Sequence, residues 1–340
     1  MSEKFIAMTR RPAEAVVGIL SIGSMGLGIA KLLLDHNYIV RTNTSNRSPE
    51  TKKRVTDASI EEVFNDEDLV AQCHYILSIV PPRDAFATAK RVIDALTNGT
   101  KPTAAESMNA PLYYLDLNAI APSTVQEIAN LFAFEAPSVR FIDGGIIGGP
   151  PTLEFNQTTK TNVWKKPGIP LSGPHSLLDA PASGSSLHSL LNCQDVGPEI
   201  GTASGLKCCF AGMAKGFTAL AIQSFSTAAK LGVLEELKVY LDGYYPGARQ
   251  RAERSVVSSG PKAYRWVEEM RQIGRCFEEV GGWGEGERLF EEVRGVYGEV
   301  AKMVEGKGKE EVKELGAFLV ALGEELRGQG TRGGENEDGN

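Results

Sequence analysis

The residues from Ser21 to Gly26 form a short turn that could bind a phosphate group. The sequence Ser21-Ile22-Gly23-Ser24-Met25-Gly26 follows the apolar run 15–20 and precedes an apolar helical pattern that ends at Leu34. A strand that turns on glycine into a helix leaves backbone N–H groups unpaired at the positive end of the helix dipole. Gly23 would let a pyrophosphate approach, and Gly26 would let the helix pack closely on the strand. We therefore expect a dinucleotide site made by these six residues, although an ordinary strand–helix turn can share the pattern, and Ser21 replaces the first glycine of the fingerprint.

The next predicted strand, 38–43, indicates which dinucleotide is bound. An NAD site usually has an Asp or Glu about here to hold the ribose 2′-hydroxyl. This chain instead continues with Thr44-Ser45-Asn46-Arg47-Ser48-Pro49 and has no acid before Glu50. An Arg flanked by amide and hydroxyl donors suits a 2′-phosphate, because the guanidinium group binds phosphate oxygens in a fork. The alternative is a solvated polar turn, and with the glycine turn present we predict NADP, bound in part by Asn46, Arg47 and Ser48.

Three lysines interrupt the long apolar helical pattern 203–231, and the first two, Lys207 and Lys215, could do chemistry. A buried ammonium group is costly without a partner, and burial tends to lower its pKa toward neutrality. Lys207, near the start of the pattern, could then accept a hydroxyl proton during oxidation or donate one during reduction. Lys215 lies two turns further on about the same face, and one of the two could instead extend its ammonium group to solvent. We predict a catalytic role for Lys207 and substrate contacts for both, and the sequence leaves open which one is the proton donor.

Ligands bind at the carboxyl ends of the strands in an open α/β sheet, and these ends carry further candidates. Val80-Pro81-Pro82 would form a stiff apolar wall for a nicotinamide ring. Asn118 offers both a donor and an acceptor beside the expected hydride-transfer position, so we expect it to contact the cofactor and orient the reacting oxygen. Gly144 and Gly145 would let the backbone approach a substrate closely, although an interdomain hinge would look similar.

The composition is that of a globular protein and excludes several classes. The chain has 340 residues, 42% of them apolar and 23% charged, with a net charge of −7. The acidic excess argues against nucleic-acid and anionic-membrane partners. We expect no apolar stretch near the ~18–20 residues that span a bilayer, and residues 1–5 lack a signal-peptide pattern. The five cysteines lack ligand-like spacing, so we expect reduced thiols, no metal site and a cytoplasmic location.

The alternation of strand and helix patterns predicts the fold class. Apolar strand-like runs at 15–20, 38–43, 75–80, 112–117 and 140–143 are separated by helical patterns. This order is typical of an α/β Rossmann domain with a doubly wound, mostly parallel sheet, which we place at 14–200. Residues 151–175 show no clear period, and short strands are expected at 169–172 and around 190–196.

The second half of the chain is predicted to be helical. An all-α domain is expected at 201–326, followed by a disordered Gly/Glu/Asn-rich tail at 327–340. The helix 203–231 is apolar on every side, so we expect it to be buried between domains or between subunits. A homodimer is therefore expected, with a small molecule as the other partner.

Taken together, these motifs resemble the β-hydroxyacid dehydrogenase/6-phosphogluconate dehydrogenase superfamily, and most closely its branch with a phosphogluconate dehydrogenase-like C-terminal helical domain. The resemblance covers about residues 14–305 and rests on the stretches 19–26, 42–48, 77–82, 116–122, 143–151, 197–201, 204–207, 215–216 and 262–270. In that branch a serine at the position of Ser21 is usual. The resemblance implies a Rossmann domain, an all-α domain that often builds a dimer, a catalytic lysine at Lys207, and oxidation of a hydroxyl next to a carboxylate-bearing carbon with NAD or NADP.

The chain departs from the superfamily at three places that concern the substrate. The Asp-x-Ser-Thr loop is replaced by Asp116-Leu117-Asn118-Ala119, and the Ser-Gly-Gly loop by Ile147-Gly148-Gly149. The asparagine expected four residues after the lysine is Ala211. The loss of these polar groups suggests a bulkier or less anionic substrate than a simple 3-hydroxy acid.

Three functional hypotheses follow. The first is an NADP(H)-dependent oxidoreductase that transfers a hydride between the nicotinamide and an alcohol or carbonyl carbon of a small hydroxy-acid-like substrate, with Lys207 moving the proton. The second is an imine (C=N) reductase, because imine reductases share this architecture and need less carboxylate binding. The third is a catalytically silent NADP-binding sensor, which would explain the missing substrate-loop groups.

Overall fold

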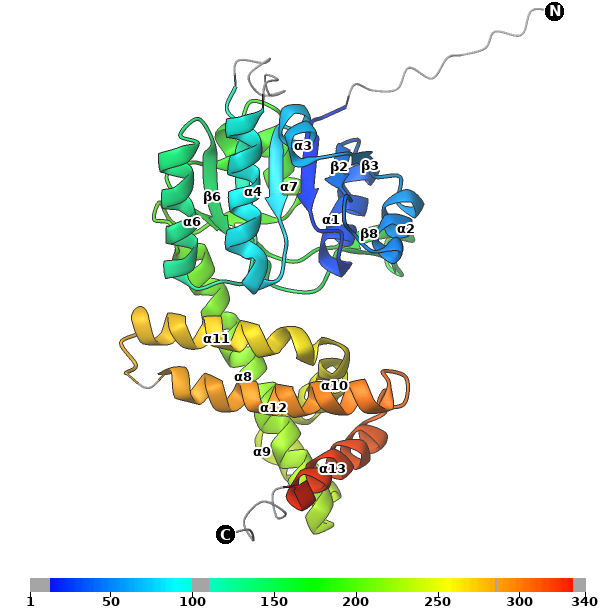
Figure 1. Ribbon diagram of the computed structural model, residues 1–340. Coiled ribbons are helices and arrows are strands. Elements are labelled where there is room, and N and C mark those ends of the chain that lie inside the picture. Colours follow the sequence, from blue (N-terminus) through cyan, green and yellow to red (C-terminus); the bar gives the residue numbers. More distant parts are fainter. Residues whose placement is uncertain (1–12, 100–109, 285, 333–340) are drawn as a thin grey trace, which may run out of the picture. The chain divides into compact units, whose positions relative to one another are not determined.

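The computed structural model describes residues 13–99, 110–284 and 286–332 (Figure 1). The chain divides into two compact units between Lys207 and Cys208, so the division lies inside one long helix. Residues 1–5, where we expected no signal peptide, lie outside the described part of the chain.

The first unit is built on a sheet with the strand order β10-β9-β6-β5-β4-β1-β2-β3. Its strands are β1 (Val16–Leu20), β2 (Ile39–Asn43), β3 (Glu61–Val63), β4 (Tyr75–Ser78), β5 (Tyr113–Asp116), β6 (Arg140–Gly144), β9 (Ile169–Ser172) and β10 (Cys193–Asp195). All neighbouring pairs are parallel except β6 and β9. The order reverses between β1 and β4, which is the switch point at which a doubly wound sheet binds its ligand. The predicted Rossmann fold is therefore confirmed.

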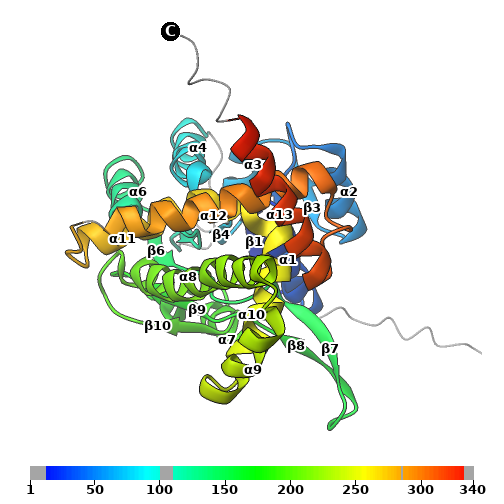
Figure 2. The same ribbon diagram turned by 90° about the horizontal axis from the view of Figure 1, so that it is seen from below.

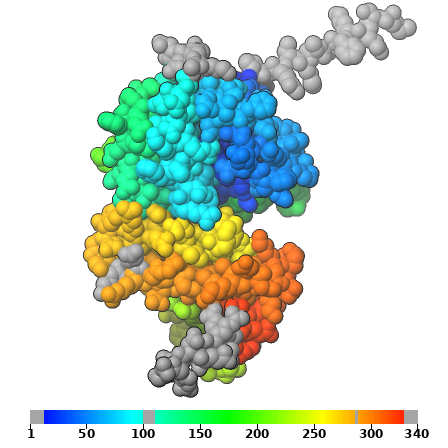
Figure 3. Space-filling view, in the orientation of Figure 1, coloured from blue at the N-terminus to red at the C-terminus, as the bar shows by residue number. Residues whose placement is uncertain are grey.

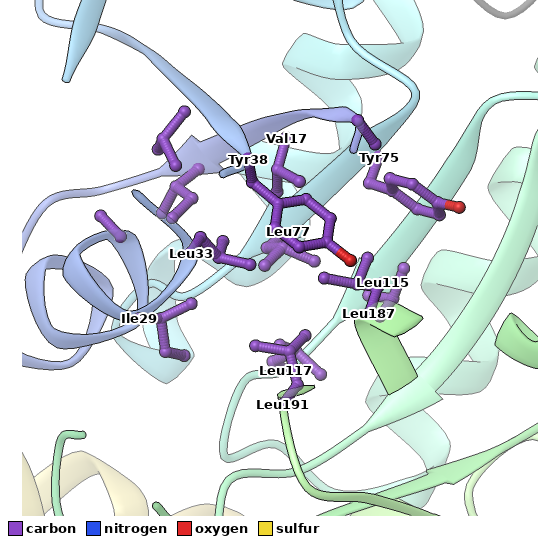
Figure 4. Close-up of a cluster of buried hydrophobic side chains, with 14 of the residues drawn as sticks. Val17, Ile29, Leu33, Tyr38, Tyr75, Leu77, Leu115, Leu117, Leu187 and Leu191 are labelled. Atoms are coloured by element: carbon purple, nitrogen blue, oxygen red, sulfur yellow. The ribbon is translucent and has the colours of Figure 1, made fainter. Parts of the chain in front are cut away.

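Helices cover both faces of this sheet. They are α1 (Ser24–Asp35), α2 (Pro49–Asp57), α3 (Asp66–Gln72), η1 (Pro82–Asp84), α4 (Ala85–Asn98), α6 (Pro122–Glu135), η2 (Leu177–Asp179) and α7 (Gly184–Leu190). Side chains of α1 and α7 pack on one face, where Figure 4 shows Ile29, Leu33 and Leu187 around Leu77 and Leu115. Helices α3, α4 and α6 pack on the other face, which α4 and α6 cover in the space-filling view (Figure 3). Because β1, β4 and β5 are apolar on both faces, they form the centre of the core.

One segment was predicted wrongly. Part of 151–175, expected to be irregular, forms an antiparallel hairpin of β7 (Thr152–Asn156) and β8 (Thr161–Lys165), which extends away from the main sheet in Figure 2. Such a two-stranded ribbon is marginal by itself. Trp164 attaches it to the domain, because its indole Nε1 donates to Asp35 Oδ2 on α1 at 2.7 Å. This contact joins segments far apart in the sequence, so no local pattern could indicate it.

The second unit is all-α, as predicted. After α8 (Thr202–Leu231) it contains α9 (Leu234–Tyr244), α10 (Ala248–Ser259), η3 (Gly260–Lys262), α11 (Ala263–Glu279), α12 (Gly286–Lys307) and α13 (Leu315–Arg332). Helices α11 and α12 form an antiparallel pair that crosses α8 (Figure 1). At the crossing, a Cβ added to Gly212 would lie 3.2 Å from the ring of Phe290 on α12 and 3.3 Å from that of Phe277 on α11, so glycine permits the close approach. The helix α13 continues to Arg332 through residues that we expected to be disordered, and 333–340 lie outside the described residues.

Within the single chain, helix α8 is buried on one side and exposed on the other. Its Met213 is 79% exposed and Leu220 is 63% exposed, and Leu206 and Phe210 are exposed with them. Its opposite side packs inside the second unit through Ile222 and Phe225, both of which are buried. The helix is therefore one-sided in its packing, although its composition is apolar all round.

The expectation about apolar stretches was also wrong for α8. Within the described ranges it is the one helix long and apolar enough, by length and composition, to cross a membrane. In its most apolar window 44% of the residues are buried inside the protein, a pattern that the core helix of a helical domain shares.

Candidate functional site

The turn after β1 leaves the start of α1 open for an anion. Ser21 adopts a left-handed backbone conformation with φ of 80°, which a glycine would adopt more readily. Gly23 is the N-cap of α1 and provides no side-chain cap to the first-turn N–H groups. A Cβ added at Gly23 would meet nothing within 4 Å, whereas one at Gly26 would lie 2.2 Å from the carbonyl oxygen of Ser21. Gly26 thus permits helix–strand packing and Gly23 leaves room for a ligand, so a pyrophosphate fits this turn.

A pocket adjoins this turn at the carboxyl end of β2. Its lining residues are Ser21, Ile22, Gly23, Thr42, Asn43, Thr44, Arg47, Thr51 and Arg54. The lining contains two arginines and no Asp or Glu. Of the residues predicted here from the sequence, Arg47 lines the pocket directly, Asn46 forms the tight turn before it with φ of 61°, and Ser48 Oγ caps α2 by accepting from the N–H of Thr51.

Arg54 and Thr44 are pocket residues that sequence reasoning missed. Arg54 donates through Nη1 to the carbonyl of Ile22 at 2.9 Å and through Nη2 to Thr51 Oγ1 at 2.9 Å. These contacts hold its guanidinium group beside the glycine turn. Thr44 Oγ1 is buried and has no hydrogen-bond partner among the described residues. Thr44 belongs to the predicted polar segment 44–49 but was given no role there, whereas Arg54 stands in no recognised motif and reaches the pocket from α2.

The predicted nicotinamide wall is held in place by Asn118. Its Oδ1 accepts from the N–H of Val80 at 2.7 Å, and its Nδ2 donates to Ser78 Oγ at 3.0 Å. Asn118 is only 2% exposed. Of the wall itself, Val80 and Pro82 are half-buried and Pro81 is exposed. The Asn118 side chain therefore joins the ends of β4 and β5, which positions the Val80-Pro81-Pro82 segment.

The two predicted glycines at the end of β6 have different surroundings. A Cβ at Gly144 would lie 2.6 Å from Leu117 Cδ2 and 2.9 Å from Leu171 Cδ2, so Gly144 is fixed by packing inside the sheet. A Cβ at Gly145 would lie 2.8 Å from the Cβ of Lys207. The Lys207 side chain thus leaves α8 directly across Gly145, and the structure brings these two predicted residues together.

A buried carboxyl group lies at the same sheet edge. Asp116 is 1% exposed, its Oδ1 accepts from the N–H of Asn118 at 3.1 Å, and its Oδ2 has no hydrogen-bond partner among the described residues. Burial raises the pKa of Asp116 to about 7. The hydrogen bonds with Asn118 lower this pKa by less than burial raises it, and the neighbouring Asp143 on β6 raises it slightly further. The carboxyl group is therefore close to half protonated at neutral pH.

Lys215 is placed in the core of the second unit. Its Nζ forms an ion pair with Glu269 of α11, in which the two side chains are 11% and 13% exposed. The same ammonium group lies 5.4 Å from the ring centroid of Trp266, and the backbone carbonyl of Lys215 accepts from Tyr297 Oη at 2.6 Å. These contacts use the Lys215 ammonium group within the helical unit, whereas Lys207 lies in the first unit.

No group of three or more His, Cys, Asp or Glu side chains that could hold a metal ion occurs in the described ranges. The five cysteines are all free thiols. We therefore derive no metal chemistry from these residues.

The sheet order, the open glycine turn and the pocket beside it define an NAD(P)-binding Rossmann domain. Residues 16–158 match the model of the NAD binding domain of 6-phosphogluconate dehydrogenase, and residues 228–307 match a domain of unknown function, DUF1932. The chain thus combines an NAD binding domain of the 6-phosphogluconate dehydrogenase type with a DUF1932 domain. The resemblance stated from the sequence motifs is thereby confirmed.

Similar proteins extend along most of the chain. An uncharacterised 28.5 kDa protein of Methanothermus fervidus is 22% identical over 231 residues, which span 66% of this chain and 76% of that protein. A conserved protein of unknown function, described as similar to 3-hydroxyacid dehydrogenases, is 23% identical with a TM-score of 0.56 and covers 83% of this chain and 97% of its own. The 3-hydroxyisobutyrate dehydrogenase of Mycobacterium tuberculosis, solved with L-serine, is 14% identical with a TM-score of 0.60 and covers 91% and 99% of the two chains. At these identities the solved structures show a shared fold, which is that of dehydrogenases.

Proposed function

We propose that this protein is an NADP(H)-dependent oxidoreductase that transfers a hydride between the nicotinamide and an alcohol or carbonyl carbon of a small hydroxy-acid-like substrate. The observation that carries the proposal is the pocket beside the glycine turn. It offers the guanidinium groups of Arg47 and Arg54 and the unpartnered, buried hydroxyl of Thr44. No carboxylate in its lining would repel a 2′-phosphate.

The residues at the other end of the site fit the chemistry of a reductase. When bound, the reduced nicotinamide supplies the hydride. The Val80-Pro81-Pro82 segment, positioned by Asn118, would exclude water from one side of the ring. Lys207 would donate a proton from Nζ to the carbonyl oxygen as the carbonyl carbon gains the hydride, and it would accept that proton in the oxidising direction. The products in the reducing direction are the alcohol, NADP⁺ and neutral Lys207, which solvent then reprotonates.

An imine substrate is the second candidate. The loop Ile147-Gly148-Gly149 has no hydroxyl that would bind a carboxylate, and Gly148 and Gly149 are exposed. A pocket without that donor favours a less anionic substrate, and a C=N bond accepts a hydride in the same geometry. If the protein binds NADPH tightly but turns over neither class of substrate, the sensor hypothesis replaces both.

We also propose a homodimer of cytoplasmic chains. The exposed apolar side chains of α8, which include Phe210, Met213 and Leu220, recur at helical spacing along one stripe. Stripes of this kind mark protein interfaces. The second copy of this chain is the partner that the proposal names, and a small molecule is the ligand.

The proposal is tested first by cofactor binding. NADPH and NADH are titrated into the wild type, Arg47→Ala and Arg54→Ala, following nicotinamide fluorescence. We expect the wild type to bind NADPH at least tenfold more tightly than NADH, and each substitution to weaken NADPH binding toward the NADH value. Lys52→Ala is the matched control, because it removes one positive charge from the exposed side of α2 outside the pocket lining. Equal affinities for both nucleotides in the wild type would overturn the NADP assignment.

Substrate screening then tests the chemistry. A panel of 3-hydroxy acids, which includes 3-hydroxyisobutyrate and L-serine, is compared with the corresponding carbonyl compounds and with cyclic imines. Lys207→Ala should lose at least a hundredfold in kcat on alcohol and carbonyl substrates, whereas imine reduction could survive it. A Lys207→Ala variant with unchanged carbonyl turnover would contradict the proposed role of Lys207.

A further inference from the structure

The strongest unassigned feature is a buried carboxylate, Asp143, at the end of β6. Asp143 is fully buried, and its two oxygens accept hydrogen bonds from four donors. Oδ2 accepts from Ser172 Oγ at 2.9 Å, from the N–H of Gly201 at 2.8 Å and from the N–H of Ser204 at 3.3 Å. Oδ1 accepts from Ser204 Oγ at 2.6 Å. Two of these donors are backbone N–H groups and two are serine hydroxyls, and none of the four carries a positive charge.

The donors show what this carboxylate stabilises. Gly201 and Ser204 belong to the start of α8, and Ser172 Oγ in turn accepts from the N–H of Ala203 at 3.0 Å. The first N–H groups of a helix have no partner within the helix, and a negative charge there is favoured by the helix dipole. Asp143 therefore caps α8 from a different element of the fold. The pKa of Asp143 is raised, because the effect of burial exceeds the lowering by these hydrogen bonds.

A second contact lies beside this cap. Gly145 follows Asp143 by two residues along the strand direction, and Lys207 follows Ser204 by three residues along the helix. Asp143 contacts Ser204, and a Cβ at Gly145 would lie 2.8 Å from Lys207 Cβ and 3.2 Å from Lys207 Cγ. The contacts Asp143–Ser204 and Gly145–Lys207 therefore follow one another along both the direction of β6 and that of α8, and they fix the first turn of α8 against the end of β6 at two points.

We infer that Asp143 is a positioning residue for Lys207: it fixes the first turn of α8 through Ser204, and Gly145 leaves the space through which the Lys207 side chain reaches the sheet edge. The inference rests on the proposed function, in which Lys207 moves the proton. Asp143 acts through the position of α8, because its hydrogen bonds go to Ser172 and to the start of this helix.

The first test measures how readily the Lys207 amine reacts with a chemical label, independently of enzyme turnover. Lys207 is labelled with trace acetic anhydride across pH 6–11, and mass spectrometry gives the pH midpoint and the limiting rate of labelling. In Asp143→Asn and Ser204→Ala we expect the limiting labelling rate of Lys207 to change at least twofold, because the first turn of α8 loses a hydrogen bond that fixes it against β6. Lys230, which is exposed in the last turn of α8, should label identically in every variant and serves as the internal control.

Two matched pairs separate positioning from general stability. Ser204→Thr keeps the hydroxyl that donates to Asp143 and should restore the wild-type profile that Ser204→Ala loses. Gly145→Ala places a methyl group against Lys207 and should lower kcat at least tenfold with NADPH affinity unchanged. Gly243→Ala on α9 is its control, because a Cβ there would meet nothing within 4 Å and Gly243 has no role in the proposed site. These variants keep the test available if Asp143→Asn does not fold.

The outcomes distinguish the two claims. Unchanged Lys207 labelling in both Ser204→Ala and Gly145→Ala would overturn the positioning role, whatever the substrate screen shows. Altered labelling combined with a Lys207→Ala enzyme of full activity would instead overturn the proposed function and leave the positioning of the Lys207 side chain intact.

Discussion

Asn118 and Val80 join two neighbouring strand ends through a 2.7 Å hydrogen bond between the Asn118 Oδ1 and the Val80 N–H. Because Asn118 is buried and also donates to Ser78, its amide group is used within the protein. We had expected the same side chain to orient a substrate oxygen. The geometry indicates that it sets the backbone of the segment beside the proposed nicotinamide position.

Asn118→Ala should therefore weaken NADPH binding more than it lowers the rate of hydride transfer. The Val80 N–H loses its acceptor, and an unsatisfied polar group costs about 1–3 kcal/mol. We expect NADPH affinity to fall about tenfold or more, measured by fluorescence titration. Ser78→Ala is the control, because it removes only the Nδ2 bond and leaves Val80 paired; it should cost less than threefold. Equal losses in the two variants would show that the Val80 bond is not decisive.

Thr44 and Thr42 provide a second, matched test of the cofactor pocket. Thr44 Oγ1 has no partner among the described residues, whereas Thr42 Oγ1 donates to the carbonyl of Ile19 at 2.8 Å. Thr44→Val should leave the apo protein as stable or more stable and weaken NADPH binding, because its hydroxyl is available only to a ligand. Thr42→Val should instead lower the apo stability by about 1 kcal/mol. Thermal unfolding with and without NADPH measures both effects, and a destabilised Thr44→Val apo protein would contradict this prediction.

The proposed dimer is tested on the exposed stripe of α8. Met213→Glu and Leu220→Glu place charges on positions that are 79% and 63% exposed, so the folded chain should tolerate them. We expect a dimer for the wild type and a shift toward monomer for the double variant, measured by light scattering coupled to size exclusion. Val239→Glu on α9, 70% exposed and away from the stripe, is the control. A wild-type monomer at micromolar concentration would refute the dimer.

The buried Lys215–Glu269 pair should contribute to the stability of the helical unit. Breaking a buried ion pair by removing one partner typically costs about 3–5 kcal/mol, because the remaining charge is left unpaired. Glu269→Gln should therefore lower the urea midpoint clearly, and the double variant Lys215→Met, Glu269→Leu should recover most of the loss. If Glu269→Gln leaves stability unchanged but raises KM, Lys215 contacts substrate, as the sequence suggested.

The parts of the fold that local patterns control could be predicted from the sequence. The strand–turn–helix from 15 to 34 and the apolar strands of the sheet are set by short-range periodicity, and they form as expected. The β7–β8 hairpin was missed, because its turn Gln157-Thr158-Thr159-Lys160 lacks the usual glycine and its anchor, Trp164 on Asp35, joins distant segments.

Some residues of the candidate site could be predicted from the sequence and others could not. Gly23, Gly26, Arg47 and Lys207 stand in recognisable local contexts. The roles of Arg54 and Asp143 depend on which backbone groups tertiary folding brings to them, and Ser204 lies 61 residues after Asp143. A buried polar residue at a strand end is visible in the sequence, but its partners are not.

Asp116 makes the stability of the protein depend on pH. Its pKa is about 7 in the folded chain against an ordinary value of 3.8, so between these values the folded state holds a proton that the unfolded state has released. The stability associated with this group is fully present below the unfolded pKa and is lost as pH rises toward 7, by about 4 kcal/mol in all. Asp116→Asn removes the titration. It keeps an acceptor for the Asn118 N–H and places an unpartnered amide where Oδ2 was, which costs about 1–3 kcal/mol at every pH.

The wild type should therefore be more stable than Asp116→Asn at pH 4 and less stable at pH 8, measured by urea unfolding. The difference between the two proteins isolates Asp116, because His74, His175 and Asp143 titrate in both. Asp57→Asn, at an exposed position on α2, is the control and should show no such crossing. A stability difference that stays constant from pH 4 to pH 8 would show that the pKa of Asp116 is not raised in the folded protein.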